Sequence, residues 1–260
     1  MQTTPTDRAN PDLSPIEMPH REIATAISDA LVNLDVQETT TRFRADNELL
    51  FLQRFLDPRW VETTLAKKAR ELLPRVHRGK VGSYKKSGSL SAFTLEEHAP
   101  EFIELYHSQE LMNFFSELVG ETLVLSPDTD PHACALYYYT EPGDHIGFHY
   151  DKSWYRGARY TVLIGLVQDT SHCLLECHPH KDEPQRETQE LTLATTPGSL
   201  VLFNGDKLWH GVSPLAEGEQ RIVLTLEYLT DSHMSTPKRW ISNFKDAVAY
   251  FGLRGITRKR

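Results

Sequence analysis

His149 and Asp151 are the residues whose types and spacing most directly suggest chemistry. They stand two positions apart in the stretch 147–151 (Gly-Phe-His-Tyr-Asp), so on a β-strand both side chains would leave the same face. A second histidine, His210, lies in the later stretch 208–212 (Leu-Trp-His-Gly-Val). Two imidazoles and one carboxylate on one face of a metal ion form the set that holds Fe(II) in non-haem sites. The sequence therefore predicts a metal centre made of His149, Asp151 and His210.

Arg221 is the next residue with a candidate role. It follows His210 by eleven positions, across the turn 216–219 (Ala-Glu-Gly-Glu), and opens an alternating run that is typical of a strand. A hairpin would bring Arg221 back toward the level of His210. Its guanidinium offers a two-pronged, permanently charged grip for a carboxylate. An arginine on the surface of a hairpin is the alternative.

Together these motifs resemble the Fe(II)/2-oxoglutarate-dependent oxygenases. The resemblance covers residues 133–230 and includes His-x-Asp, the strand 197–203 (Pro-Gly-Ser-Leu-Val-Leu-Phe), His-Gly-Val and the following arginine. It implies a double-stranded β-helix (jelly roll), with Fe(II), 2-oxoglutarate and O2 as cofactors and with Arg221 binding 2-oxoglutarate. Tyr139, ten residues before His149 and followed by Gly143, resembles the prolyl-hydroxylase branch. That likeness makes Tyr139 a second 2-oxoglutarate contact, with a packed core aromatic as the alternative.

A narrower resemblance is to the bacterial oxygenases of free amino acids, which include radical halogenases of lysine-like substrates. It rests on the run 149–163 and on Trp240 near the C-terminus. The halogenases have Gly where this chain has Asp151, so the resemblance implies hydroxylation. The expected enzyme is a dioxygenase that hydroxylates an unactivated C–H of a free amino acid, lysine or a similar basic one, with release of succinate and CO2. A peptidyl or prolyl hydroxylase, and a metal-binding β-barrel without oxygenase activity, are the alternatives.

Substrate contacts are expected from His145, at the start of the strand that carries His149, from Trp240, and from Glu227, which could pair with a substrate ammonium. Asp231 is an equal candidate for that pairing. A further group, Cys173, Cys177, His178 and His180, has zinc-ligand types. Its spacing fits no common structural zinc site, so a strand followed by a charged loop is the favoured interpretation.

The elements that must position these residues change in character along the chain. Residues 1–19 are predicted to be a disordered lead-in to a single domain, 20–260. Its helical part, 20–120, includes an apolar helical face at 23–34, a helix that begins at Asp57-Pro58, a capping box at Thr94, and a helix from Ser108 to Gly120. Nine short β-prone runs follow in a core from 121 to 230, and a C-terminal helical segment, 231–260, contains a helix over 242–251. The fold class is therefore α+β with a mainly β jelly-roll core and N-terminal helices packed on one sheet.

The composition of the chain limits the classes of partner that we expect it to bind. The 260 residues carry a formal net charge of −8, which disfavours nucleic-acid binding. The sequence has no apolar run long enough for a membrane span and begins with no apolar stretch of a secretory signal, and its three cysteines suit a reducing compartment. We therefore expect a cytoplasmic enzyme with a small-molecule partner, no nucleic acid and no membrane; the oligomeric state stays open.

Overall fold

The computed structural model describes residues 17–234 and 247–257. The lead-in 1–16, residues 242–246 of the predicted C-terminal helix, and Trp240 lie outside these ranges. Helix α1 begins at Glu17, ahead of the boundary expected after residue 19, and residues 247–255 are helical.

The N-terminal half is mainly helical. Its elements are α1 (Glu17–Val32), α2 (Val36–Ala45), α3 (Pro58–Val61), a π-helical turn η1 (Glu62–Ala66), α4 (Lys67–Glu71), a 3-10 turn η2 (Leu73–Arg75), α5 (Ala92–His98), α6 (Pro100–Tyr106) and α7 (Gln109–Val119). The predicted caps at Asp57 and Ser108 are confirmed, because each side chain accepts a backbone N–H of its own first turn. Gly120 ends α7 in the left-handed conformation, as a C-cap glycine does. The capping box at Thr94 is wrong: Ser91 caps α5, three residues earlier.

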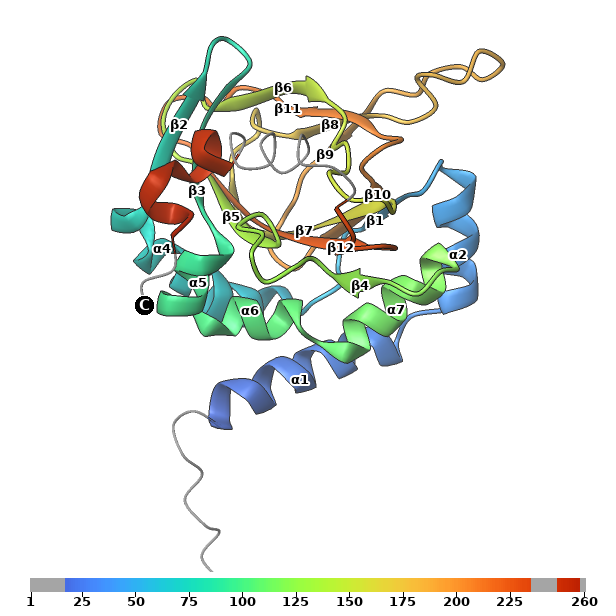
Figure 1. The fold of residues 1–260 in the computed structure, drawn as a ribbon, viewed down its shortest axis with the longest axis horizontal. Coiled ribbons are helices and arrows are strands. Elements are labelled where there is room, and N and C mark those ends of the chain that lie inside the picture. The colour runs from blue at the N-terminus through green and yellow to red at the C-terminus, as the bar shows by residue number, and fades with distance from the viewer. Residues whose placement is uncertain (1–16, 235–246, 258–260) are drawn as a thin grey trace, which may run out of the picture.

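Within the described residues the strands form one curled, antiparallel arrangement. They are β1 (Leu49–Leu52), β2 (His77–Val81), β3 (Lys85–Leu90), β4 (Val124–Leu125), β5 (Cys134–Tyr139), β6 (His145–His149), β7 (Arg159–Asp169), β8 (Leu175–His178), β9 (Leu191–Leu193), β10 (Leu200–Asn204), β11 (Trp209–Val212) and β12 (Gln220–Leu229). The order of pairing is β1-β10-β7-β12-β5-β3-β6-β11-β8-β9. Because β3 pairs with both β5 and β6, it joins a larger sheet to a smaller one that faces it (Figure 1).

This is the jelly roll expected from the sequence, and all nine strands predicted after Gly120 are present. Strands β1, β2 and β3 were not predicted. Leu49–Leu52 is too short to show a period, and His77–Leu90 is largely polar.

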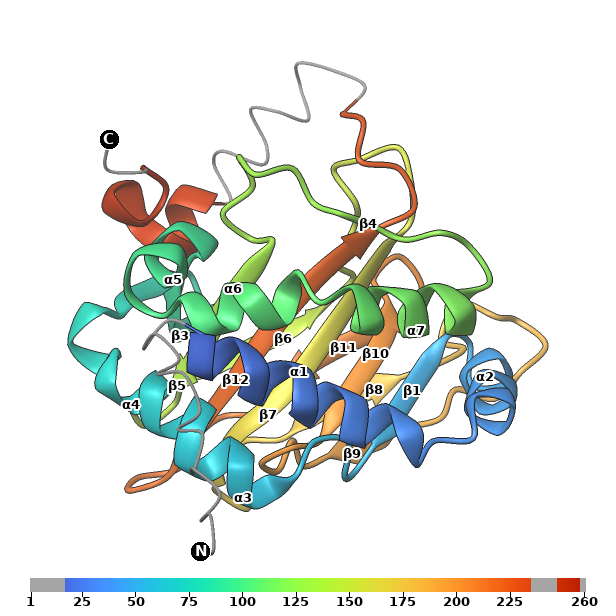
Figure 2. The same ribbon diagram turned by 90° about the horizontal axis from the view of Figure 1, so that it is seen from below.

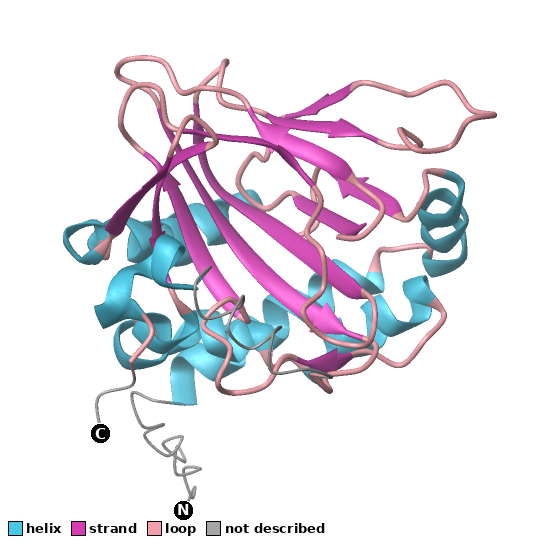
Figure 3. Cartoon of the chain, turned by 45° about the horizontal axis from the view of Figure 1, so that its top comes forward, coloured by secondary structure: helices cyan, strands magenta, loops and turns pink. Residues whose placement is uncertain are grey.

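Two apolar clusters stabilise the arrangement. The larger lies between the helices and the outer face of the larger sheet, where α1, α6 and α7 cross the long strands β7 and β12 (Figure 2). The smaller lies between the two sheets and includes Leu163, Phe203 and Val223. Helices therefore cover one face of the larger sheet, and the other face looks into the space enclosed by the smaller sheet (Figure 3). The described part of the chain contains no helix with the length and apolar character that a membrane span needs.

Candidate metal centre

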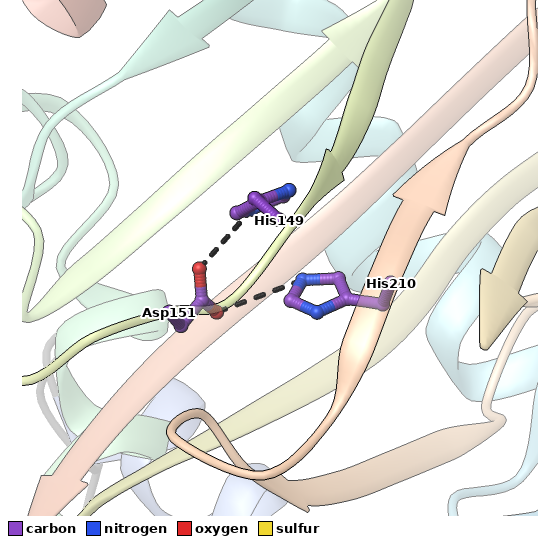
Figure 4. A group of neighbouring side chains, drawn as sticks. All are labelled: His149, Asp151 and His210. Atoms are coloured by element: carbon purple, nitrogen blue, oxygen red, sulfur yellow. Dashed lines mark ion pairs between the residues drawn. The ribbon is translucent and has the colours of Figure 1, made fainter. Parts of the chain in front are cut away.

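The three predicted ligands meet at one end of the space between the sheets. His149 ends β6 and His210 lies on β11, and the two residues are direct partners across these antiparallel strands. Asp151 comes two residues after the end of β6. Its Oδ1 lies 3.2 Å from Nε2 of His149, and its Oδ2 lies 3.7 Å from Nε2 of His210 (Figure 4). Each residue thus turns one ligand atom toward a common point, with all three atoms within 4.8 Å of one another.

The distances suit a divalent metal. Ligand atoms at about 2.1 Å from a metal and at right angles to each other lie about 3.0 Å apart, close to the separations seen here. Nδ1 of His149 faces the carbonyl of Gly147 at 2.9 Å, and Nδ1 of His210 faces that of Leu208 at 3.1 Å. A carbonyl accepts, so Nδ1 of each ring carries the proton and Nε2 keeps its lone pair for a metal. The donor set and its orientation therefore fit Fe(II).

The surroundings of the three side chains favour the forms that bind a metal in two cases, the ionised carboxylate of Asp151 and the neutral ring of His210. Burial opposes ionisation of Asp151, but His210, Arg159 and His149 outweigh it and hold the pKa of Asp151 well below its usual range. Burial lowers the pKa of His210 to about 4, against the pull of Asp151. Burial also works to lower the pKa of His149, but the hydrogen bond and the charge of Asp151 raise it overall. A metal would therefore displace a proton mainly from His149.

The metal centre opens into a cavity of about 310 Å³ between the sheets. That volume is at the lower end of the range for small-molecule sites. Two other predicted residues, Arg221 and Tyr139, line the same cavity. The predicted hairpin is wrong, because β11 pairs with β6 and β8 whereas β12 pairs with β5 and β7 in the facing sheet. The connection between β11 and β12 crosses from one sheet to the other, and His210 and Arg221 meet across the cavity instead of along a hairpin.

Arg221 is a buried cation, 1% exposed. Its Nε donates to the hydroxyl of Thr195 at 3.1 Å, and its guanidinium carbon lies 4.9 Å from the centre of the Tyr139 ring. Tyr139 is its direct cross-strand partner on β5. Burial raises the pKa of Tyr139, which keeps its hydroxyl protonated as a donor. The ion pairs among the described residues include none with Arg221, so its charge is available to an anionic ligand.

Glu227 lines the cavity as well, but its carboxylate is engaged. Arg159 donates to it from Nε at 2.5 Å and from Nη2 at 2.6 Å, a two-pronged ion pair. Burial raises the pKa of Glu227 to about 7, and Arg159 opposes that rise. Asp231, the equal candidate in the sequence, contacts exposed His233 and is absent from the described lining of the cavity. Of the two candidates, Glu227 alone is among the described residues that line the cavity.

His145 does not join the site. Its two ring nitrogens lie 2.8 Å and 2.9 Å from the carbonyls of Gly143 and Ser83, and it is not among the described residues that line the cavity. The expectation of a substrate contact from His145 therefore lacks support from the geometry. The ring faces the backbone carbonyls of Gly143 and Ser83 instead of the cavity.

The cysteine and histidine group does not gather around one point. Cys173 and Cys177 are buried between the sheets, whereas His178 packs on Phe148 and His180 contacts Glu183. Within the described residues, His149, Asp151 and His210 are the one group of three with metal-ligand geometry. The favoured interpretation, a strand with alternating faces followed by a loop, is confirmed.

Three residues of the site were missed in the sequence: Arg159, Thr161 and Thr195. Arg159, Thr161 and Leu163 alternate along β7 and all three line the cavity, so their spacing was an available signal. Thr195 follows β9 in a loop, and nothing in its sequence context indicates a contact with Arg221.

The chain is similar to known proteins in sequence and in fold. Its sequence matches the family described as Halogenase D over residues 33–244. No protein in a curated set matches it.

Several solved structures share the fold. The non-haem α-ketoglutarate-dependent epimerase SnoN of nogalamycin biosynthesis is 16% identical, with a TM-score of 0.60, over 74% of this chain and 81% of its own. A prolyl hydroxylase from Trichoplax adhaerens, solved with a peptide fragment of hypoxia inducible factor, is 13% identical, with a TM-score of 0.58, over 89% and 98%. A 2OG-Fe(II) oxygenase family oxidoreductase from Burkholderia pseudomallei is 16% identical, with a TM-score of 0.56, over 78% and 94%. At these identities the likeness confirms the jelly roll.

Proposed function

The chain belongs to the halogenase D family, and from that premise we propose that it is an Fe(II)- and 2-oxoglutarate-dependent dioxygenase that hydroxylates a free amino acid. The family is one of enzymes, in agreement with the prediction from the sequence. The predicted cofactors also agree with the neighbours in fold, one of which was solved with Fe3+ and α-ketoglutarate.

One observation carries the proposal: a single cavity contains both the metal-ligand set and a buried arginine that has no carboxylate partner among the described residues. A buried guanidinium without a counter-charge is costly, and a dianionic ligand would supply that charge. The acid group of 2-oxoglutarate distant from its keto acid fits Arg221, with the Tyr139 hydroxyl beside it as a further donor. Iron, when bound, supplies oxygen activation and cleavage of the C–H bond.

Asp151 favours oxygen insertion over halogen transfer. The halogenases that the sequence resembles have Gly at this position, which frees a metal position for a halide. Here Asp151 is present, ionised, and directed at the same point as both histidines. A carboxylate in that position occupies the place that a halide would need.

The cavity is small enough to favour a free amino acid over a peptide. Glu227 and Arg159 form its wall away from Arg221 and offer, side by side, an acceptor for an ammonium and a donor for a carboxylate. Lysine or a similar basic amino acid is the first candidate, from the resemblance of the run 149–163. A peptide substrate is the second candidate, because Tyr139 and the fold are also similar to the prolyl hydroxylases.

The test is a substrate screen with purified protein, Fe(II), ascorbate and 2-oxoglutarate. We expect one or a few free amino acids to stimulate succinate release, with a gain of one oxygen in the product mass. Turnover of peptides but of no free amino acid would select the second candidate. No succinate above background with any substrate, together with no measurable binding of 2-oxoglutarate, would favour a metal-binding barrel without oxygenase activity.

A further inference from the structure

Thr161 is a buried residue on β7 that touches the metal centre without being a ligand. It is 1% exposed, and its hydroxyl oxygen lies 3.1 Å from Oδ2 of Asp151. The same oxygen lies 3.2 Å from Oε2 of Glu227. Thr161 and Glu227 are direct partners across β7 and β12, so backbone pairing fixes this contact.

The contact at Oδ2 matters because a carboxylate has two oxygens. A carboxylate that gives one oxygen to a metal can rotate unless its other oxygen is held by a donor. The hydroxyl of Thr161 has one proton to donate, and Arg159 already donates to both oxygens of Glu227, so the proton goes to Oδ2 of Asp151. Oδ1 is then left on the side of His149, 3.2 Å from its Nε2.

We propose that Thr161 is a positioning residue that fixes the orientation of the Asp151 carboxylate in the metal centre. The inference rests on the proposed metal site and adds a residue to it. Thr161 offers no ligand atom in the group of three; it acts by donating a hydrogen bond to Oδ2 of Asp151.

Thr161 lies directly beside the ion pair on the cavity wall. Arg159 grips Glu227 from two nitrogens, and Glu227 contacts the Thr161 hydroxyl. Arg159 and Thr161 are two positions apart on β7 and share the face that looks into the cavity. The contacts form a continuous series, Arg159 to Glu227 to Thr161 to Asp151, from the wall away from Arg221 to the metal ligand. A change in the Arg159–Glu227 ion pair should therefore alter the orientation of the Asp151 carboxylate.

Titration of the full chain with Co(II) tests the role of Thr161 without need of substrate. The visible ligand-field bands report the geometry of the ligand set, and the titration gives the affinity. Thr161→Val removes the hydroxyl with almost no change of shape, and Thr161→Ser keeps it. Thr39→Val is the matched control, because Thr39 is also a buried threonine but lies on α2, where its hydroxyl donates to the backbone carbonyl of Asp35. Circular dichroism and a thermal melt check that each variant is folded.

We expect Thr161→Val to weaken Co(II) binding by about 10- to 100-fold, the usual effect of losing a partner of a metal ligand, and to shift the visible bands. Thr161→Ser should restore both affinity and bands, and Thr39→Val should change neither. A folded Thr161→Val protein with the affinity and bands of the wild type would overturn the inference. So would a Thr161→Ser protein that is as impaired as Thr161→Val.

A double-mutant cycle tests the link to the wall and remains informative if Thr161→Val melts early. Glu227→Gln alone should shift the Co(II) bands, and it should cause no additional shift in a Thr161→Val background. Equal shifts in both backgrounds would refute transmission through Thr161. Failure of the wild-type protein to bind Co(II) at all would refute the metal site of the proposed function, an outcome distinct from those above.

Discussion

Replacement of Arg221 by Gln gives the sharpest test of how the cosubstrate is held. Arg221 is buried in the cavity, and one of its five N–H groups is donated to Thr195. Arg221 also has a side-chain hydrogen bond with Tyr139, and its terminal nitrogens face no carboxylate among the described residues. They can hold a carboxylate of 2-oxoglutarate in two charge-assisted hydrogen bonds. Gln at this position would be shorter and neutral, so both bonds and the charge would be lost.

Each such bond contributes about 1.5–3 kcal/mol. Loss of both bonds would cost about 3–6 kcal/mol of binding free energy. Because water can replace part of the contact, we take the lower value as the expected minimum. Each 1.4 kcal/mol is a factor of ten, so the dissociation constant of 2-oxoglutarate should rise by roughly 100-fold or more. Arg221→Lys should fall between the wild type and Arg221→Gln, because it keeps the charge but loses the two-pronged geometry.

Calorimetric titration of Mn(II)-loaded protein with 2-oxoglutarate, without oxygen, measures this directly and needs no substrate. Arg70→Gln is the matched control: Arg70 contacts Gln220, next to Arg221 on β12, but it is an exposed residue outside the cavity. We expect its affinity to equal that of the wild type. If Arg221→Gln also bound 2-oxoglutarate as the wild type does, the assignment of Arg221, and with it the choice of cosubstrate, would be refuted.

The remaining predictions concern the metal ligands and their support. His210→Ala should abolish retention of iron and turnover, measured by metal analysis after desalting; full activity would overturn the ligand assignment. Asp151→Gly should lose oxygen insertion, seen as the absence of the oxidised product by mass spectrometry, and an unchanged rate would contradict the role of this carboxylate. Gly205→Ala should weaken metal binding, because an added Cβ would lie 2.5 Å from the carbonyl oxygen and 2.7 Å from Cβ of Asp151; we expect a stability loss of about 1–3 kcal/mol in urea unfolding, and wild-type values in both measurements would refute this steric argument. Metal affinity should fall as the pH is lowered, by about tenfold per pH unit below the pKa of His149, because that pKa is raised and the ring must lose its proton to bind; a flat profile across the neutral range would contradict it.

Much of the fold and of the candidate metal centre could be predicted from local patterns in the sequence. The His-x-Asp spacing and the strand before His210 each depend on residues close together in the chain, where the strand period alone decides which side chains share a face. The hairpin expected between His210 and Arg221 does not form, because β11 and β12 pair with different strands in the two facing sheets. The nine strands after Gly120 could be predicted because apolar runs and turn residues alternate along that part of the chain. Strands β2 and β3 could not be predicted, because their residues are mostly polar. They form through backbone pairing with each other and, for β3, with β5 and β6.

Whether an individual polar residue lines the cavity depends on contacts between distant parts of the chain. Glu227 and Asp231 are equivalent in the sequence, yet β12 carries Glu227 into the cavity beside Arg159, whereas Asp231 lies beyond the end of the strand. His145 has the right type and position for a substrate contact, and two backbone carbonyls hold its ring elsewhere. The spacing along β7 could have placed Thr161 on the face of Arg159, but its contacts with Asp151 and Glu227 follow only from the pairing of distant strands.

By itself, then, the sequence predicted the jelly roll and the three residues that meet at the candidate metal centre, because short-range spacing and strand alternation are properties of the local chain. The tertiary structure decided that Arg221 is buried without a carboxylate partner among the described residues, that Glu227 is clamped by Arg159, and that Thr161 holds Asp151. Those three facts depend on hydrogen bonds and ion pairs between strands far apart in the chain, and their formation is governed by how the sheets pair and close around the cavity.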